Sequence, residues 1–446
     1  MKVLRWVNLI LIVVFLSACG SSNANGTSEP SGLGSIFSQD TPTPPLPTPI
    51  VGITPAPDAA AVVTQYLDAM KQDDYETMYS MLTQASRDAI NLEDFSKRWN
   101  NALNTMGAAK IEYAINSSLI HPDDAEVGYS ITYKTALVGD IQRSILIRLH
   151  LEDGGWKIVW EDSQILPELV GGNQLAMEYS VPSRGDIYTS DGLPVVSQSK
   201  AIAFGIQTDQ IDPKLSGSLK TELGKLCGYD PEYIQDLIDI NGTGAYIPMC
   251  EGTREEAQRL LSINPGGLVM NEYESRYYFN SGIAPQAVGY TLSIPQEDVN
   301  LYRRLGYRGD EKVGKSGIEQ WAEDYLAGKH GGVLNVVAPD GQIVSTLGQS
   351  NSQPADSVYL TLDRTMQLNA QKAIQYYRGA VVVMEVDTGR ILAMASGPGF
   401  DPNFFDPNNP NNGGLSTMVN DTTNPLFNRA AQGQYPLGSV FKIITT

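Results

Sequence analysis

The sequence contains few of the side chains that most often bind metal ions. Among 446 residues there are three cysteines and three histidines, and no cluster of them has metal-ligand spacing. The histidines, His121, His150 and His330, are scattered along the chain. We therefore expect neither a metal ion nor an organic cofactor.

Basic residues are scarce relative to acidic ones. The chain has 31 lysines and arginines against 50 aspartates and glutamates, which gives a formal net charge of -19 at pH 7. Such a surface repels the phosphate backbone of a nucleic acid, whose binding depends on neutralisation by cations. The composition therefore argues against a nucleic-acid partner.

The apolar run near the N-terminus is short. It extends from Trp6 to Leu16, is interrupted by Asn8, and follows the basic residues Lys2 and Arg5. About 10 apolar residues cannot cross ~30 Å of hydrocarbon as a helix, so the pattern predicts an export signal.

The residues Leu16 to Cys19 resemble the bacterial lipobox, a motif whose cysteine is acylated and becomes the new N-terminus. The resemblance implies a lipoprotein signal peptide at residues 1–19, a lipid on Cys19, and a body anchored at the extracytoplasmic face of the cell membrane. An uncleaved anchor helix and plain secretion are the alternatives. Each of the three places the body of the chain outside the cytoplasm.

Cys227 and Cys250 are the two cysteines beyond this leader. In an oxidising compartment two such thiols can form a disulfide. Two buried free thiols are an equally good interpretation, and the sequence does not choose between them.

Shifts in composition divide the rest of the chain into a tether and three folded regions. Residues 20–57 are largely Ser, Gly, Asn, Thr and Pro, too polar to offset the entropy of ordering, so we expect an extended tether. Folded regions are predicted at residues 58–169, 172–353 and 356–446. A length of 446 residues with 42% apolar composition is sufficient for about three such domains.

The first folded region predicts three helices on a curved antiparallel sheet. Apolar residues recur with helical spacing in three segments, and four strand-like runs follow, the last two separated by a turn at Gly154 and Gly155. The helical segments are 62–70, 75–82 and 92–99, and the strands are 111–115, 127–137, 144–151 and 156–160. The second region mixes short strands such as 201–206 with helical stretches such as 231–240.

A serine and a lysine near the C-terminus form a candidate catalytic pair. In the segment Gln434 to Lys442, Gly438 allows a tight turn, and Ser439 then opens an apolar stretch that predicts a helix. Residues three apart on a helix share a face, so the Lys442 amine can reach the Ser439 hydroxyl. A serine hydroxyl is a weak nucleophile until a neighbouring base takes its proton, which is the role that a partly neutral lysine can serve.

Two other segments match the consensus of a known motif, but their residue composition and flanking sequence do not support the corresponding site. Ser197 to Lys200 repeats the Ser-x-x-Lys spacing in a polar stretch with no apolar helix after it, and we interpret it as a solvated loop. Gly309 to Ser316 spells a phosphate-binding loop, but it contains Asp310 and Glu311 and lacks a preceding buried strand. We therefore do not expect nucleotide binding.

The context of Ser439 is more specific than the motif itself. Gly379 to Ser396 predicts a hairpin of two apolar strands around an Asp-Thr-Gly turn, followed by a long Asn/Pro/Gly loop that leads to Ser439. This order resembles the start of the transpeptidase domain of penicillin-binding proteins, and residues 361–367 resemble its opening strand and helix. Upstream, residues 184–192, 276–290 and 314–328 resemble the signatures of the class B pedestal. The helices and strands of 58–169 resemble the nuclear-transport-factor-like (NTF2-like) domain at the front of the methicillin-resistance type.

The resemblance implies an α+β multidomain protein. Residues 58–169 would form an N-terminal α+β cone with a spacer role, and 172–353 a mixed α/β pedestal of the dimerisation type. Residues 356–446 would form the N-terminal part of a penicillin-binding or β-lactamase-like α/β transpeptidase domain. The implied role of Glu319 is internal hydrogen bonding and packing.

The implied reaction is D,D-transpeptidation of peptidoglycan. Ser439 would attack the D-Ala-D-Ala carbonyl of a stem peptide, with Lys442 as proton acceptor and the Ser439 amide as one oxyanion donor, and β-lactams would acylate the same hydroxyl. A partner glycosyltransferase of the wall-synthesis machinery would polymerise the glycan. The alternatives are a non-catalytic cell-wall scaffold and a β-lactam-binding sensor.

The sequence departs from the family pattern in two respects. Leu437 stands where the family usually has a second proline, which should affect the rigidity of the loop more than the chemistry. The later Ser-x-Asn and Lys-Thr/Ser-Gly motifs do not follow Lys442. We therefore expect a C-terminally truncated fragment that is inactive by itself, with apolar surface exposed around Val381 to Val383.

Overall fold

The computed structural model describes residues 58–263 and 266–445. The leader with Cys19 and the tether at 20–57 lie outside these residues. Among the helices of the described part, none has the length and apolar character required to cross a membrane.

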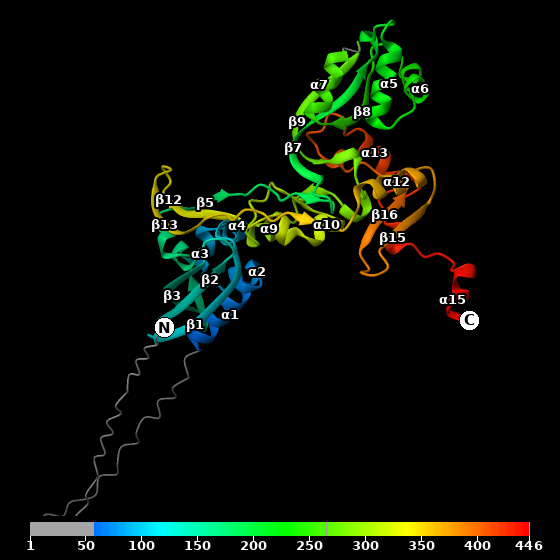
Figure 1. The fold of residues 1–446 in the computed structure, drawn as a ribbon. Helices are drawn as coiled ribbons and strands as arrows, with labels where there is room; N and C mark the ends of the chain where they lie inside the picture. The colour runs from blue at the N-terminus through cyan, green and yellow to red at the C-terminus, as the bar shows by residue number, and fades with distance from the viewer. Residues whose placement is uncertain (1–57, 264–265, 446) are drawn as a thin grey trace, which may run out of the picture. The chain divides into compact units, whose positions relative to one another are not determined.

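The N-terminal domain is an antiparallel sheet in the order β1-β2-β3-β4 on which helices α1 and α4 pack (Figure 1). Helix α1 begins at Ala59 because Asp58 Oδ1 accepts hydrogen bonds from the amides of Ala60 and Ala61, at 3.0 and 3.3 Å. Its helices are α1 (Ala59–Lys71), α2 (Tyr75–Ser80), α3 (Gln84–Ala89) and α4 (Leu92–Thr105); its strands are β1 (Ala108–Ile120), β2 (Asp124–Thr135), β3 (Asp140–Glu152) and β4 (Gly155–Val159). The 3₁₀ turns η1 (Asp162–Gln164) and η2 (Pro167–Leu169) follow.

Large aromatic side chains fill the core between these helices and the sheet. Tyr66 and Trp99 from the helices and Tyr129 and Tyr133 from β2 are fully buried. The hydroxyl of Tyr133 donates to the Ile165 carbonyl at 2.7 Å, so its polar tip is satisfied as well. The predicted arrangement of helices on an antiparallel sheet is confirmed.

The expected count of three helices in this domain was wrong, because α3 is a fourth. Thr83 caps it by accepting from the Ser86 amide at 3.2 Å. Ser86 is its one buried residue, so the helix has no apolar stripe by which periodicity could reveal it.

The pedestal contains two main sheets and a short hairpin. One sheet has the order β13-β12-β5; the other has the order β14-β6-β7-β8, with β9 also paired to β7. The strands are β5 (Gln174–Ser180), β6 (Ile187–Tyr188), β7 (Pro194–Gln207), β8 (Tyr246–Gly252), β9 (Leu268–Tyr278), β12 (Gly331–Val337), β13 (Ile343–Ser350) and β14 (Val358–Tyr359), with β10 (Thr291–Ser293) and β11 (Lys312–Gly314) forming the hairpin. The helices are α5 (Ser216–Cys227), α6 (Pro231–Asn241), α7 (Arg254–Ile263), α8 (Pro285–Val288), α9 (Val299–Arg304), α10 (Gly317–Trp321) and α11 (Glu323–Leu326), with 3₁₀ turns η3 (Thr208–Gln210) and η4 (Phe279–Ser281).

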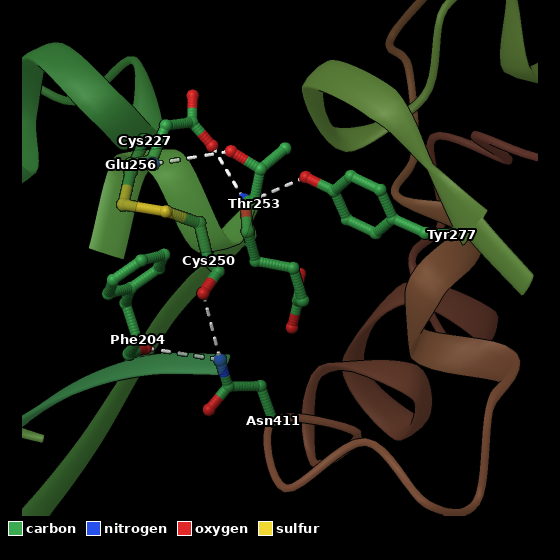
Figure 2. Close-up of a disulfide and its surroundings, with 8 residues drawn as sticks. Phe204, Cys227, Cys250, Thr253, Glu256, Tyr277 and Asn411 are labelled. Carbon is green, nitrogen blue, oxygen red and sulfur yellow. Dashed lines mark hydrogen bonds between the residues drawn. A yellow bond between two sulfur atoms is a disulfide. The ribbon is translucent and has the colours of Figure 1, made fainter. Parts of the chain in front are cut away.

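Helices α5, α6 and α7 surround one end of strands β7, β8 and β9 and form a separate apolar core with them (Figure 1). We call this part, residues 202–270, the head lobe. Within it the structure joins Cys227 of α5 to Cys250 of β8 in a disulfide, with the Cα atoms 5.5 Å apart (Figure 2). The bond fastens the end of α5 to the strand.

The interpretation of Ser197 to Lys200 as a loop was wrong, because these residues belong to strand β7. Ser197 pairs with Tyr277 of β9 and Lys200 with Glu274, so the polar stretch is one side of an antiparallel ladder. Residues i and i+3 of a strand point to opposite faces, so Lys200 is not placed to activate Ser197. Instead, Lys200 Nζ lies 3.2 Å from Glu272 Oε1.

A buried carboxylate holds distant parts of the pedestal together. Glu319 of α10 has no exposed surface, and it accepts from Arg276 Nε at 2.5 Å and from Arg184 Nε at 3.0 Å. Tyr278 donates its hydroxyl to the same carboxylate at 3.1 Å, and Arg184 also contacts Glu323 at 2.7 Å. Burial opposes the charge of Arg184, but the carboxylates of Glu319 and Glu323 outweigh it and raise the pKa of Arg184. These contacts assign Glu319 the internal role that its sequence context implied.

The C-terminal segment has a two-stranded hairpin packed on a helix. Helix α12 begins after Asp363, whose Oδ1 accepts from the Met366 amide at 2.7 Å. Val381 and Val383 are half-buried against the helix, whereas Val382 is 45% exposed, so the expected exposed apolar surface is present at Val382. The elements are α12 (Arg364–Ile374), β15 (Gly379–Met384), β16 (Ile391–Gly397), η5 (Pro402–Phe405), α13 (Gly414–Val419), α14 (Arg429–Gln432), η6 (Gly438–Phe441) and α15 (Lys442–Thr445).

We expect Glu319→Gln to lower the free energy of unfolding of the pedestal by about 3–5 kcal/mol, because the buried guanidinium of Arg276 loses its counter-charge and that of Arg184 keeps only Glu323. Urea unfolding followed by circular dichroism measures the change. The matched control is Glu93→Gln, which removes an exposed carboxylate 2.6 Å from Lys97 and should leave the unfolding midpoint near that of the wild type. Equal effects of the two substitutions would contradict the role assigned to Glu319.

Candidate active site

Ser439 lies in a short helical segment that starts with a tight turn. Gly438 has φ +54°, in the left-handed region that favours glycine, and no atom lies within 4 Å of the position of a Cβ there. The 3₁₀ turn η6 contains Ser439 and continues directly into α15, whose first residue is Lys442. The predicted turn and helix are therefore present, and the two residues are separated by one helical turn.

This segment is exposed, although it is rich in large apolar side chains. Val440 and Phe441 are 67% and 45% exposed, and Ile443 and Ile444 are 82% and 76% exposed. Leu437, which replaces the usual second proline, is also exposed and has helical backbone angles. A helix that is apolar on several sides is typical of one that packs inside a domain.

The chain before Ser439 is fastened to the hairpin and to the pedestal. Ser396 Oγ of β16 donates to the Phe427 carbonyl at 3.1 Å and accepts from the Arg429 amide at 3.0 Å. Gln286 of the pedestal helix α8 donates from Nε2 to the Pro425 carbonyl at 2.8 Å and to the Pro398 carbonyl at 3.0 Å. These contacts hold the chain in place before it continues to Ser439.

Sequence analysis did not identify Gln286 or Ser396 as supports of the site. Both are buried, and their partners are backbone carbonyls and amides, which carry no sequence signal. The available indications were that Gln286 lies inside the segment 276–290, which resembles a pedestal signature, and that Ser396 ends the segment 379–396, which resembles the start of the transpeptidase domain.

Residues 309–316, which match the consensus of a phosphate-binding loop, do not form a phosphate site. The amide of Gly309 donates to Glu311 Oε2 at 2.7 Å, that of Gly314 to Glu323 Oε2 at 2.8 Å, and that of Lys315 to the Tyr290 carbonyl at 2.9 Å. A phosphate cradle requires such amides to point at the ligand. In this segment the amides donate instead to acceptors within the pedestal.

The N-terminal domain has an open cavity of about 980 Å³ between α3, α4 and β5. The charged groups that line it are paired with neighbours: Arg98 lies 2.6 Å from Asp162, and Lys97 lies 2.6 Å from Glu93. Within the described ranges, no group of three or more His, Cys, Asp or Glu side chains is arranged to hold a metal ion. The spacer role of this domain stays a prediction.

Three family models match consecutive parts of the chain. Residues 58–173 match an NTF2-like N-terminal transpeptidase domain, residues 179–360 a penicillin-binding protein dimerisation domain, and residues 379–446 a penicillin-binding protein transpeptidase domain. Together they follow the order of regions that the sequence predicted.

Similar curated proteins carry transpeptidase names. "Peptidoglycan D,D-transpeptidase MrdA" of Escherichia coli K12 is 28% identical over 283 residues, which cover 60% of this chain and 44% of that protein. The MrdA protein of Acinetobacter baumannii is 32% identical over 176 residues, covering 40% of this chain and 26% of that protein. "Penicillin-binding protein 3" of Bacillus subtilis is 23% identical over 342 residues, covering 74% of this chain and 50% of that protein. The chain thus spans half or less of the length of these relatives.

A solved structure, a complex between penicillin-binding protein PBP2 and MreC from Helicobacter pylori, is similar at 24% sequence identity and a TM-score of 0.38. The similarity covers 61% of this chain and 51% of that chain. With the three domain matches in this order and the transpeptidases among its relatives, the chain belongs to the class B penicillin-binding proteins and carries an NTF2-like N-terminal domain.

Proposed function

We propose that this chain carries the acylation site of a peptidoglycan D,D-transpeptidase, with Ser439 as nucleophile and Lys442 as its general base. The observation that carries the proposal is their placement one helical turn apart, directly after the turn at Gly438. They lie inside residues 379–446, the part that matches the transpeptidase family.

The proposed reaction has two acyl transfers. Ser439 Oγ forms a bond to the carbonyl carbon between the two D-alanines of a stem peptide, while its proton passes to Lys442 Nζ. The amide C–N bond then breaks, and the proton returns to the nitrogen of the departing D-alanine. The amine of a second stem peptide then attacks the ester carbonyl and gives up a proton to Lys442. The ester C–O bond breaks, Ser439 Oγ takes the proton back, and the new amide bond is the cross-link.

The same hydroxyl would react with β-lactams. Their strained ring contains an amide whose carbonyl the serine attacks in the same way, and the opened ring stays attached as an ester. A covalent adduct on Ser439 is therefore the most direct experimental signature of the site.

The proposal for the N-terminal part of the chain concerns where the protein is located and how its body is held there. We propose that Cys19 is lipidated, that the body lies at the extracytoplasmic face of the membrane, and that residues 58–169 act as a spacer in front of the pedestal. Glycan polymerisation would be done by a partner glycosyltransferase of the wall-synthesis machinery.

We expect the full-length gene product to form one penicilloyl adduct on Ser439, and Ser439→Ala to abolish it because the attacking oxygen is gone. Intact-protein mass spectrometry followed by peptide mapping measures the adduct. Ser197→Ala is the matched control, since Ser197 has the same Ser-x-x-Lys spacing on strand β7 and should leave the adduct unchanged. An adduct at another residue, or none in the wild type, would refute the assignment and favour a scaffold.

Replacing the proposed base should slow acylation without unfolding the protein. We expect Lys442→Ala to lower the acylation rate by about 10²–10⁴-fold, the usual contribution of a general base, as measured by stopped-flow with a chromogenic β-lactam. Lys200→Ala removes a lysine that is paired with Glu272 on the surface of β7 and should leave the rate unchanged. A wild-type rate in Lys442→Ala would show that another group accepts the proton.

Lipidation of Cys19 can be tested by fractionation. In the native bacterium we expect the wild-type protein to be recovered with membranes and labelled by an alkyne fatty acid, and Cys19→Ser to lose the label. Cys227→Ser is the control, because that residue lies in the head lobe. Equal labelling of Cys19→Ser and the wild type would exclude this cysteine as the acylation site.

A further inference from the structure

A loop of the C-terminal segment docks on the head lobe through buried asparagines. This loop, residues 401–413, is called the Asn-rich loop below. Asn411 is 1% exposed, and its Nδ2 donates to the carbonyls of Phe204 at 3.1 Å and Cys250 at 3.2 Å (Figure 2). Its Oδ1 accepts from the Tyr246 hydroxyl at 2.9 Å. The loop therefore contacts β8 next to the disulfide.

Two more buried asparagines complete the contact. Asn409 Nδ2 donates to Glu251 Oε1 at 2.8 Å and to the Asn403 carbonyl at 3.0 Å. Asn403 has no exposed surface; it accepts from the Tyr278 amide at 2.9 Å and donates to the Tyr278 carbonyl at 2.9 Å. Because these amides are hydrogen-bonded, the polar loop can be buried at little cost.

One polar atom of the contact is not satisfied in this way. Glu251 is 5% exposed, and its Oε2 is buried without a hydrogen-bond partner among the described residues. The carboxyl of Asp401, at the start of the Asn-rich loop, interacts with the Glu251 carboxyl. Its Oδ1 already accepts from the amide and Nδ2 of Asn403, both at 2.8 Å. Two ionised carboxylates cannot donate to each other, whereas a single proton between them forms an O–H···O bond.

The charges around the pair do not compensate a second negative charge. Lys312, which reaches the loop, lies 2.8 Å from Asp406 and is paired there. Burial first, and the charge of Asp401 second, raise the pKa of Glu251 to about 8; burial also raises the pKa of Asp401. The titratable side chains that interact electrostatically with one or both of these carboxyls are Tyr229, Tyr246, Tyr273 and Tyr277. Glu256 and Arg364 act in turn on Tyr277, and Asp406 acts on Tyr273.

The tyrosines among these groups do not titrate in the same range. Burial raises the pKa of Tyr273 and of Tyr277 well above the ordinary value, so both hydroxyls keep their protons. Tyr277 donates its hydroxyl to the Glu251 carbonyl at 3.2 Å, on the backbone side of the pair. The proton between the two carboxyls is thus the one that the contact can lose near neutral pH.

We propose that the contact between the head lobe and the Asn-rich loop is a proton-dependent latch, closed while Glu251 and Asp401 share one proton and opened by its loss. Opening would separate β8 from residues 401–413 and free the head lobe from the segment that leads to Ser439. The proposal does not depend on the reaction at Ser439.

The direction of the pH dependence follows from the raised pKa. When the latch opens, both carboxyls reach water and ionise near their ordinary values of about 4, so the open form binds fewer protons than the closed form. The closed form is therefore fully favoured below that range and loses stability as the pH rises toward the closed-state pKa of Glu251, about 8. Above that value the opening equilibrium should no longer change.

Hydrogen exchange of the full chain, followed by mass spectrometry from pH 5 to pH 9 and corrected for intrinsic rates, tests the latch. In peptides covering 246–252 and 403–412 we expect protection to fall by up to about tenfold per pH unit between about pH 5 and about pH 8, then to level off. Peptides of the N-terminal sheet should keep constant protection over the same range.

Two isosteric variants separate the latch from general effects of pH. In Glu251→Gln the amide can donate to Asp401 without a titrating proton, so protection at pH 8 should equal that of the wild type at pH 5. Asp401→Asn should also remove the slope. Glu255→Gln, an exposed glutamate four residues beyond Glu251, should keep the wild-type slope.

Three results would overturn the proposal. They are a wild-type profile without a slope in both peptides, a slope that persists in both variants, and protection at pH 8 that calcium or magnesium restores and EDTA removes. The last result would mean that a cation, not a proton, joins the two carboxyls. The wild-type profile decides the first point even if neither variant folds.

Discussion

The carboxylate of Glu319 is the charge around which the pedestal is organised. It joins α10 to Arg184, 135 residues earlier, and to Arg276 on β9, 43 residues earlier. Helix α10 in turn packs closely on α8: a Cβ on Gly289 would lie 1.8 Å from the Ser316 carbonyl oxygen, so only glycine fits there. Gln286, on α8, donates hydrogen bonds to the carbonyls of Pro425 and Pro398. These bonds hold the chain that leads to Ser439. The buried ion pair of Glu319 is thus connected, through packed helices and hydrogen bonds, to the chain that precedes Ser439.

The pedestal is also joined to the N-terminal domain by specific contacts. Arg304 of α9 forms a bidentate ion pair with Asp73, at 2.7 and 2.8 Å, and its Nε donates to Asn104 Oδ1 at 3.0 Å. Leu334 of β12 is fully buried in the core that Trp99 and Tyr66 dominate. Asp73 and Asn104 lie 231 and 200 positions before Arg304 in the sequence, so the interface depends on both domains being folded.

The spacing of apolar residues predicted the helices and strands in which these residues repeat regularly, but few of the other structural features. Val63, Tyr66, Leu67 and Met70 repeat with helical spacing and lie on the buried face of α1, and the alternation in β2 is equally regular. Helix α3 has no such repeat, and Ser197 to Lys200 is polar on both faces, so both were missed. The pairing of Glu251 with Asp401 brings together two acidic residues 150 positions apart, and no spacing rule reports such a contact. For Ser439 and Lys442 the relevant geometry is one helical turn, so sequence alone was sufficient to propose the pair, and its catalytic role stays a prediction.

Composition was misleading in two opposite ways in the C-terminal segment. The Asn-rich loop has the residues of a solvated loop, yet Asn403, Asn409 and Asn411 are buried because each side-chain amide finds backbone or carboxyl partners. Those of Asn409 and Asn411 include groups of the head lobe, and those of Asn403 include Tyr278 at the end of β9. The segment after Gly438 has the residues of a core helix, yet Val440 and Ile443 are exposed. Burial follows the availability of partners and not polarity alone, since a satisfied amide costs little to bury and an apolar side chain is buried only where another surface covers it. The buried polar loop is therefore a hydrogen-bonded connection between the head lobe and the residues that precede Ser439. A single shared proton within that connection is consequently able to affect a larger part of the structure than its own two side chains.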